Sequence, residues 1–391
     1  MPLIVHGSAW LALPVIALQG VLVLGYLVWL LRGAPGVSPS VRRPATWPRV
    51  DIIVPVRNEA RWIEGKLRNL AELRYPVESL RVFVVDGAST DATASIVAAH
   101  VARDSRVSLV RFPMADKIAQ LNAGLRRGDA EWIVVTDADA RLPVETLEQL
   151  MATGEADPSV AVVGAPVTPA GPLALEALHW RLGNYLRGRE GRRGCASLVA
   201  GPCFAFRRGL LSAWPGDAVA DDMHVTFAAM TAGRRVQLID VAVTELRSPR
   251  HLAELFRHKF RRAHAYLREV FRFLPRVPSM PSPARTVFLW RAAHLTILPL
   301  LLLVTAGLGL AAIGHVMTSP AGTLAIGVGM VVVAAAWWAS RRVQSLATIV
   351  ALGALITVAL VFALAALPFW RQRACFPKVA AAGQPAGEVI R

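Results

Sequence analysis

Cysteine is scarce in this chain, and the few cysteines form no recognisable motif. The three, Cys195, Cys203 and Cys375, lack the spacing of a zinc finger or a disulfide framework, so we expect a structural role for each. Acidic residues are also few, because 27 Asp and Glu stand against 43 Lys and Arg, a formal net charge of +16. Such an excess suits nucleic acid, but the chain has neither a recognition-helix pattern nor an aromatic-basic binding sheet. We therefore expect no nucleic-acid partner and assign the basic residues to a membrane surface.

Charge is missing from several long hydrophobic stretches. Hydrophobic residues make up 54% of the chain, which is too many for an ordinary soluble enzyme. The stretches long enough to cross a bilayer are Ser8–Leu31, His294–Met317, Ala321–Ala339 and Val343–Trp370. They contain almost no polar groups, which argues against a transporter. The chain is therefore expected to be an integral membrane protein.

The basic residues near these stretches predict an orientation. Nothing basic precedes the first stretch except His6, and arginines follow it, which is the reverse of a cleavable signal peptide. The positive-inside rule then places the N-terminus outside and residue 32 onward in the cytoplasm, as in a bacterial-type plasma membrane. Four spans would leave the C-terminus outside, yet Arg371, Arg373 and Lys378 follow the last one. The number of spans and the side of the C-terminus stay open.

Between the spans, strand and helix patterns alternate, which predicts an α/β domain with a mostly parallel sheet. The expected strands are Val50–Val56, Leu80–Val85, Val107–Phe112, Trp132–Thr136 and Ser159–Gly164. The expected helices are Glu59–Leu73, a helix capped by Asp91 that runs to about Val101, and Lys117–Arg127.

The strand Trp132–Thr136 ends at two carboxylates, Asp137 and Asp139. Ligands of open α/β sheets bind outside the carboxyl ends of the strands, so these acids are expected at a ligand site. Two acids this close favour a Mg²⁺ or Mn²⁺ ion between them, shared with substrate phosphates. A strand that runs into an Asp-rich turn explains the same residues equally well.

The first strand-helix turn contains no glycine, since it reads Pro55-Val56-Arg57-Asn58-Glu59. A nicotinamide-dependent enzyme needs Gly-x-Gly-x-x-Gly at this position, so the turn argues against a dinucleotide site.

Several motifs occur in one order along the domain. They are Ile53–Glu59, Val85–Asp91, Lys117–Gly124 and Asp137–Asp139. In this order they resemble the family 2 glycosyltransferases, inverting enzymes with a GT-A fold, over roughly residues 50–266. The resemblance implies that donor-binding residues are Pro55, Asn58, Glu59, Asp86, Asp91, Lys117, Asn122 and Asp137. It also implies that Asp137 and Asp139 hold a divalent cation, with Asp86 at the uracil and ribose end of the donor.

Later segments extend the resemblance to the acceptor side. Gly201–Arg208 is similar to the family's glycine-led strand, where glycine lets an acceptor approach the backbone. We place Gly201, Phe204 and Arg262 there. The charged segment at 187–193 is expected as a solvated loop, with an acceptor-side or diphosphate-contacting loop as the alternative.

Asp221 and Asp222 stand at the start of a predicted helix that runs to Thr231. Acids there also serve as caps and dipole partners. The pair matches the family's acidic motif, which implies that Asp222 is the catalytic base, with Asp221 as the fallback. A base is needed because inversion by direct displacement requires a carboxylate that deprotonates the acceptor hydroxyl.

A basic amphipathic helix is predicted from His251 to Leu274, and it is expected to lie at the membrane surface. Processive synthases of the family carry Gln-x-x-Arg-Trp here, whereas this chain has His258-Lys259-Phe260-Arg261-Arg262. Of the motif's residues, the arginine is present as Arg261, and we expect it to contact the donor diphosphate. The missing tryptophan favours transfer of a single sugar over polymer synthesis.

The sequence therefore predicts a membrane-bound inverting glycosyltransferase that moves a sugar, with a UDP-sugar as the expected donor, to a membrane lipid or a lipid-linked glycan. A processive exopolysaccharide synthase is the alternative, and a non-catalytic export component is a distant one. The expected parts are a transmembrane helix (1–32), a linker (33–49), a cytoplasmic GT-A domain (50–250), interfacial helices (251–293), about three transmembrane helices (294–370) and a tail (371–391).

Overall fold

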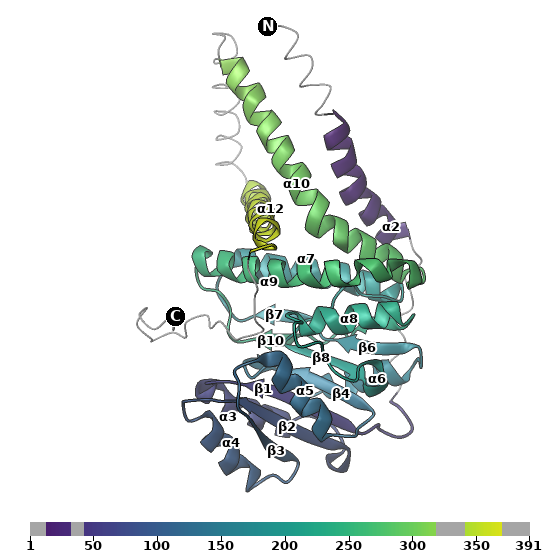
Figure 1. Ribbon diagram of the computed structural model, residues 1–391, viewed down its shortest axis with the longest axis vertical. Helices are drawn as coiled ribbons and strands as arrows, with labels where there is room; N and C mark the ends of the chain where they lie inside the picture. The colour runs from purple at the N-terminus through teal and green to yellow at the C-terminus, as the bar shows by residue number, and fades with distance from the viewer. Residues whose placement is uncertain (1–12, 33–42, 318–340, 370–391) are drawn as a thin grey trace.

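A computed structural model describes residues 13–32, 43–317 and 341–369 (Figure 1). The expected span Ala321–Ala339, residues 33–42 of the linker and the tail 371–391 lie outside the described residues.

The central element is a seven-stranded sheet with the order β3-β2-β1-β4-β8-β6-β9. Its strands are β1 (Val50–Val56), β2 (Leu80–Gly87), β3 (Val107–Phe112), β4 (Trp132–Thr136), β6 (Val160–Gly164), β8 (Cys203–Arg207) and β9 (Arg235–Leu238). Only β8 runs antiparallel to its neighbours β4 and β6, so the expected mostly parallel sheet is confirmed. Every residue of β1 and β4 is buried, as continuous apolar strands covered on both faces must be.

Helices cover both faces of this sheet. They are α3 (Ala60–Ala71), α4 (Thr93–Val101), α5 (Lys117–Arg127), α6 (Thr146–Glu155), α7 (Ala174–Arg192) and α8 (Asp221–Thr231). A small sheet of β5 (Ala140–Arg141), β10 (Val243–Glu245) and β7 (Val167–Pro169) lies beside the main one. The expected helices therefore form, with ends shifted by one or two residues at α3 and α4.

The charged segment 187–193 differs from the solvated loop expected there, because it continues helix α7 to Arg192. Arg187 is 4% exposed and Glu190 is 3% exposed. Glu190 accepts a hydrogen bond from the backbone N–H of Ser197 at 2.6 Å and another from the Tyr26 hydroxyl. Burial of these charges is possible because each has polar partners, and that information is not present in local sequence.

Helix α9 (Leu252–Phe273) lies crosswise between the sheet and the long hydrophobic helices, together with α7 (Figure 1). Much of its apolar side packs inside the protein: Leu267 and Val270 are buried in contact with a cluster that includes residues of α8, α10 (Ala284–Met317) and α12 (Arg341–Ala366). Leu252 and Phe271 remain exposed. One apolar core thus joins the sheet domain to its hydrophobic helices.

Among the described residues, three helices are long and apolar enough to cross a membrane: Leu13–Arg32, Ala284–Ala311 and Thr348–Ala366. Helix α10 begins at Ala284, earlier than the expected His294, because residues 284–293, expected among the interfacial helices, continue directly into the hydrophobic segment. The first span is fastened to α10 by Gln19, whose Nε2 donates to the Leu301 carbonyl at 2.8 Å and to Thr305 Oγ1 at 2.5 Å. Such interhelical hydrogen bonds stabilise helix pairs in lipid.

Two helical glycines provide a test of packing under the sheet. A Cβ at Gly154 in α6 would lie 2.4 Å from the Trp132 ring, whereas a Cβ at Gly65 in α3 meets nothing within 4 Å. We expect Gly154→Ala to destabilise the protein by about 1–3 kcal/mol through overpacking, and Gly65→Ala to leave it unchanged or slightly stabilised. Melting temperatures of the two purified variants check this, and equal values would contradict the packing described.

Candidate active site

The acidic turn after β4 is held by helix α3. Lys66 Nζ donates to Thr136 Oγ1 at 2.7 Å and to the Ala140 carbonyl at 2.8 Å, on either side of the turn. Asn69 exchanges hydrogen bonds of 2.7 and 2.8 Å with the backbone of Leu142. Burial lowers the pKa of Lys66 to about 8. The turn is therefore rigidly placed at the edge where β1 and β4 end.

Lys117, at the start of α5, joins two of the predicted acidic motifs. Its Nζ lies 3.0 Å from Asp137 Oδ1 and 3.3 Å from Asp221 Oδ1. Burial alone would lower the pKa of Lys117, but the charges of Asp137 and Asp221 raise it above its usual value. The structure thus brings together three residues that are far apart in the sequence.

Asp222 faces the same region from the N-terminus of α8. Its Oδ2 accepts a hydrogen bond from the Gly201 N–H at 3.1 Å, and its Oδ1 accepts one from Met223 at 2.7 Å. Burial, followed by the neighbouring charge of Asp221, raises the pKa of Asp222 to about 6. A Cβ at Gly201 would lie 3.6 Å from Asp222 Oδ2 and 3.8 Å from Asp137 Oδ2. Glycine therefore keeps open the space that these two carboxylates share.

Asp139 is the second carboxylate of the turn after β4. Burial raises the pKa of Asp139, and Arg247, 3.3 Å away, opposes this rise. A hard cation fits beside a partly buried pair of like charges such as Asp137 and Asp139. Within 13–32, 43–317 and 341–369, no cluster of three or more His, Cys, Asp or Glu could hold a metal. The protein would therefore offer a cation these two carboxylates, and the remaining ligands would be phosphate oxygens or water.

Asp86, at the end of β2, has one carboxylate oxygen without a hydrogen-bond partner among the described residues. Its Oδ1 is buried, and no residue in the described part of the chain forms a hydrogen bond with it. Its Oδ2 accepts only a long bond of 3.4 Å from the Ser89 N–H. Buried polar atoms are normally satisfied, so this oxygen is available to a ligand.

Several other residues expected at the donor form contacts that join the loop after β1 to the loop after β2. Asn58 Oδ1 accepts a bond from the Thr90 N–H at 2.7 Å, and Asp91 Oδ2 accepts one from the Ala60 N–H at 3.2 Å. Asn58 has a positive φ of 50°, which asparagine tolerates better than most residues. Glu59 pairs with Arg247. These contacts fix the shape of the loops.

Pro55 occupies a position in β1 where a missing N–H is tolerated. The pairing of β1 with β4 ends at Ile53 and Val135, so Pro55 lies beyond it.

Asn122 and Phe204, expected on the donor and acceptor sides, contact other parts of the protein. Both amide atoms of Asn122 bond to the backbone of Trp214 at 2.8 Å. Phe204 is fully buried in the core and stacks on Phe206. Their contacts are structural. Arg261, on α9, is partly buried; burial and the neighbouring Arg262 lower its pKa, whereas Asp137 opposes this shift.

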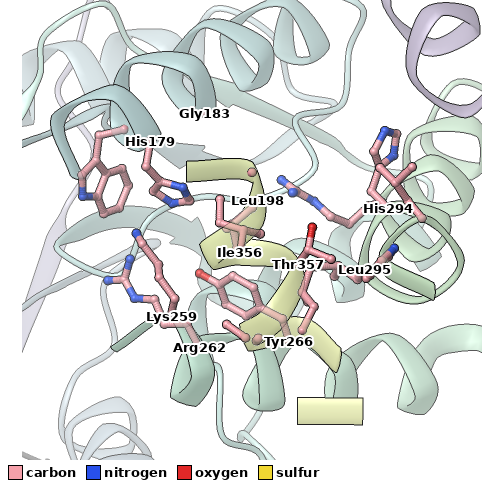
Figure 2. A pocket seen from close by; sticks show the side chains of 18 of the residues that line it. His179, Gly183, Leu198, Lys259, Arg262, Tyr266, His294, Leu295, Ile356 and Thr357 are labelled. Atoms are coloured by element: carbon pink, nitrogen blue, oxygen red, sulfur yellow. The ribbon is translucent and has the colours of Figure 1, made fainter. Parts of the chain in front are cut away.

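A cavity of about 360 Å³ adjoins Asp222 and Gly201. Figure 2 shows His179, Lys259 and Arg262 on one side of it and His294 with Leu295 on the opposite side. Its remaining walls include Leu298 and Leu302 of α10 and Ile356 and Leu360 of α12. The cavity therefore extends from the acidic site to helices that could span a membrane.

Known proteins share this fold. A mannosyltransferase from Pyrobaculum calidifontis, solved in complex with GDP-Man and Mn²⁺, superposes with a TM-score of 0.72 at 27% identity, covering 93% of this chain and 99% of that one. Residues 51–214 match the sequence profile of Glycosyl transferase family 2. This stretch of the chain, residues 51–214, belongs to the family 2 glycosyltransferases.

Curated relatives of the chain carry names of different activities. An N-acetylglucosaminyltransferase from Rhizobium sp. (strain N33) is 25% identical over 60% of this chain and 56% of its own length. A beta-monoglucosyldiacylglycerol synthase from Nostoc sp. (strain PCC 7120) is 28% identical over 46% of this chain and 41% of its own length. The chain thus spans about half the length of the curated relatives it matches.

Several residues of the candidate site were not expected from the sequence. Lys66 could have been noticed, because it lies on the apolar face of α3 beside Ile63 and Leu67, where a lysine needs partners. Arg247, which pairs with both Glu59 and Asp139, carries no comparable signal. Tertiary structure alone brings it to the site.

The contacts of Asn122 give a testable distinction between donor binding and support of the fold. We expect Asn122→Ala to destabilise the fold by about 1–3 kcal/mol, because it leaves the buried Trp214 backbone without partners. Its affinity for nucleoside diphosphate should stay close to that of the wild type. Thermal unfolding and equilibrium binding measure the two effects, and weaker binding with unchanged stability would restore the donor-contact role.

Proposed function

We propose that this protein is a membrane-bound inverting glycosyltransferase that moves one sugar from a nucleotide-sugar to a membrane-associated lipid or glycan. The cavity between Asp222 and the helices α10 and α12 carries this proposal, because it joins a candidate base to segments that suit a bilayer. We place residues 50–250 in the cytoplasm and the spans in a bacterial-type plasma membrane. The name of the Nostoc relative, a beta-monoglucosyldiacylglycerol synthase, supports a lipid acceptor.

The donor end uses groups at the carboxyl edge of the sheet. Asp86 offers its unpaired oxygen to the nucleoside, with a UDP-sugar as the expected donor, although the Pyrobaculum neighbour was solved with GDP-Man. Lys117 and Arg261 lie where positive charge would meet the diphosphate. Asp137 and Asp139 would hold a Mg²⁺ or Mn²⁺ ion, which offsets charge on the leaving diphosphate when bound. The Mn²⁺ of that neighbour supports this assignment.

At the acceptor end, Asp222 serves as the base. It takes the proton of the acceptor hydroxyl while that oxygen bonds to the anomeric carbon and the bond to the diphosphate oxygen breaks. Its pKa of about 6 leaves it ionised at neutral pH yet more basic than an ordinary aspartate. Asp221 is less suited, since its Oδ1 is occupied by Lys117.

The decisive experiment is release of nucleoside diphosphate by the purified full-length protein in detergent. It uses a panel of nucleotide-sugars, native membrane lipid extract as acceptor, and samples with and without Mg²⁺ or Mn²⁺. We expect metal-dependent turnover of one donor, reduced roughly 10²- to 10⁴-fold in Asp222→Asn. Donor affinity should persist in that variant.

Asp240→Asn is the matched control, since Asp240 is exposed and carries the same change of charge. No turnover with any donor, or an equal loss in both variants, would contradict the proposal. Products with many sugars would instead identify a processive synthase.

The pair Asp221 and Asp222 also predicts the pH dependence. A base with a raised pKa loses activity as the pH falls through about 6, where it becomes protonated. The charge of Asp221 contributes to that raised value, so Asp221→Asn should move the acidic limb of kcat/KM to lower pH. A pH profile of both proteins measures the shift, and an unmoved or higher limb would show that Asp222 is not the titrating group.

A further inference from the structure

The cavity beside Asp222 is lined by four basic side chains from three helices. This basic cluster consists of Arg187 of α7, Lys259 and Arg262 of α9, and Arg291 near the start of α10. All four lower the pKa of the buried His179, which burial lowers first. His179 is therefore neutral and adds no charge, while the cluster itself is strongly positive.

Two members of the basic cluster have carboxylate partners. Lys259 Nζ lies 2.6 Å from Glu176 Oε2, and Arg262 lies 3.6 Å from Glu245 Oε1.

The other two have none. Arg187 is 4% exposed and donates only to the Gly183 carbonyl at 3.0 Å and to Asn184 Oδ1 at 2.7 Å. Arg291 donates to Ser197 Oγ at 2.7 Å, and its Nε is buried without a partner. Among the residues that the structure describes, neither guanidinium forms an ion pair. Buried cations are normally paired, so this end of the cavity fits an anion.

The opposite end of the cavity is apolar. Leu298 and Leu302 of α10 and Ile356 and Leu360 of α12 line it, and all four lie within candidate spans. An occupant that satisfies both ends has an anionic group next to a hydrocarbon chain. A soluble anion would fill only the basic end.

We propose that the basic cluster binds the phosphate of a lipid acceptor whose chain lies between α10 and α12 and whose hydroxyl-bearing head reaches Asp222. This assignment rests on the proposed function and specifies its acceptor. The phosphate is an anchor rather than the nucleophile, because an ionised phosphate oxygen has no proton for Asp222 to remove. Arginine suits this task, since its planar fork recognises phosphate oxygens in pairs.

Lipid binding to the purified full-length protein tests the proposal without any donor. The probes are two matched pairs: polyprenyl phosphate with polyprenol, and phosphatidylglycerol with diacylglycerol of the same acyl chains. At least one phosphate-bearing lipid should bind roughly tenfold or more tightly than its uncharged counterpart. Arg187→Gln and Arg291→Gln should each reduce that preference, while binding of the uncharged lipids stays the same.

Arg181→Gln is the matched control, because Arg181 is an exposed arginine on the same helix, α7. Arg181→Gln should keep the full preference for the phosphate-bearing lipid. Arg187→Lys should retain part of the preference that Arg187→Gln loses. Equal affinity for charged and uncharged lipids in both pairs, or a preference that survives both glutamine variants, would overturn the proposal. Inorganic phosphate could also be tested as a competitor of the phosphate-bearing lipid. If it displaced the lipid completely at the concentration at which it binds the protein by itself, the basic cluster would be assigned to a soluble anion instead.

Nucleoside diphosphate binding separates this proposal from the function it rests on. It should be unchanged in Arg187→Gln and Arg291→Gln, and its loss in both would place the basic cluster at the donor diphosphate. Sugar transfer without phosphate-dependent lipid binding would leave the proposed function standing and remove the lipid anchor. Phosphate-dependent lipid binding without any sugar transfer would support the lipid anchor and contradict the proposed function.

Discussion

The site depends on one partly buried cation, Lys117, held between two carboxylates from distant parts of the chain. It lies 3.0 Å from Asp137 and 3.3 Å from Asp221, so α5, the end of β4 and the start of α8 meet at one amino group. Removing the lysine would leave like charges facing one another in a buried space, which is costly. The same arrangement suits a reaction in which negative charge develops on a leaving group, because the donor of positive charge is already fixed in place. Structural and catalytic demands thus coincide at this residue.

The strands and acidic motifs were predictable because they depend on short-range patterns. The strands Val107–Phe112 and Trp132–Thr136 and the helix Lys117–Arg127 form with the predicted ends. For Trp132–Thr136 the reason is that a buried parallel strand reads as an unbroken apolar run. That the acids end up together also follows from topology, because parallel strands carry their carboxyl ends to one edge. What each polar group does there was harder to anticipate. Asn122 stands in a motif that implied donor contact, yet its amide fastens the Trp214 backbone.

The parts that sequence could not provide are those that depend on which helix faces meet. Arg187 belongs to a charged segment that has the composition of a solvated loop, and only its packing reveals a buried helix. Arg291 stands about a hundred residues further along, at the start of a hydrophobic helix, so no spacing rule relates the two. Both line one cavity together with residues of α9, which packs against α10 and α12. Long-range contacts of this kind carry no local signature.

The continuous core between the sheet domain and the hydrophobic helices bears on how an acceptor is presented. Phe227 of α8 packs edge-on against Phe288 of α10 with ring centroids 4.7 Å apart, and Phe273 of α9 meets Phe227 at 5.6 Å. A domain tied to its spans by such contacts cannot swing away from the membrane without exposing apolar surface. Asp222 is therefore held at a fixed height above the helices, next to the cavity that opens toward them. In the proposed function, a base at a fixed position relative to the bilayer would receive the head of a lipid that diffuses in the membrane plane, which would supply part of the positioning that transfer requires.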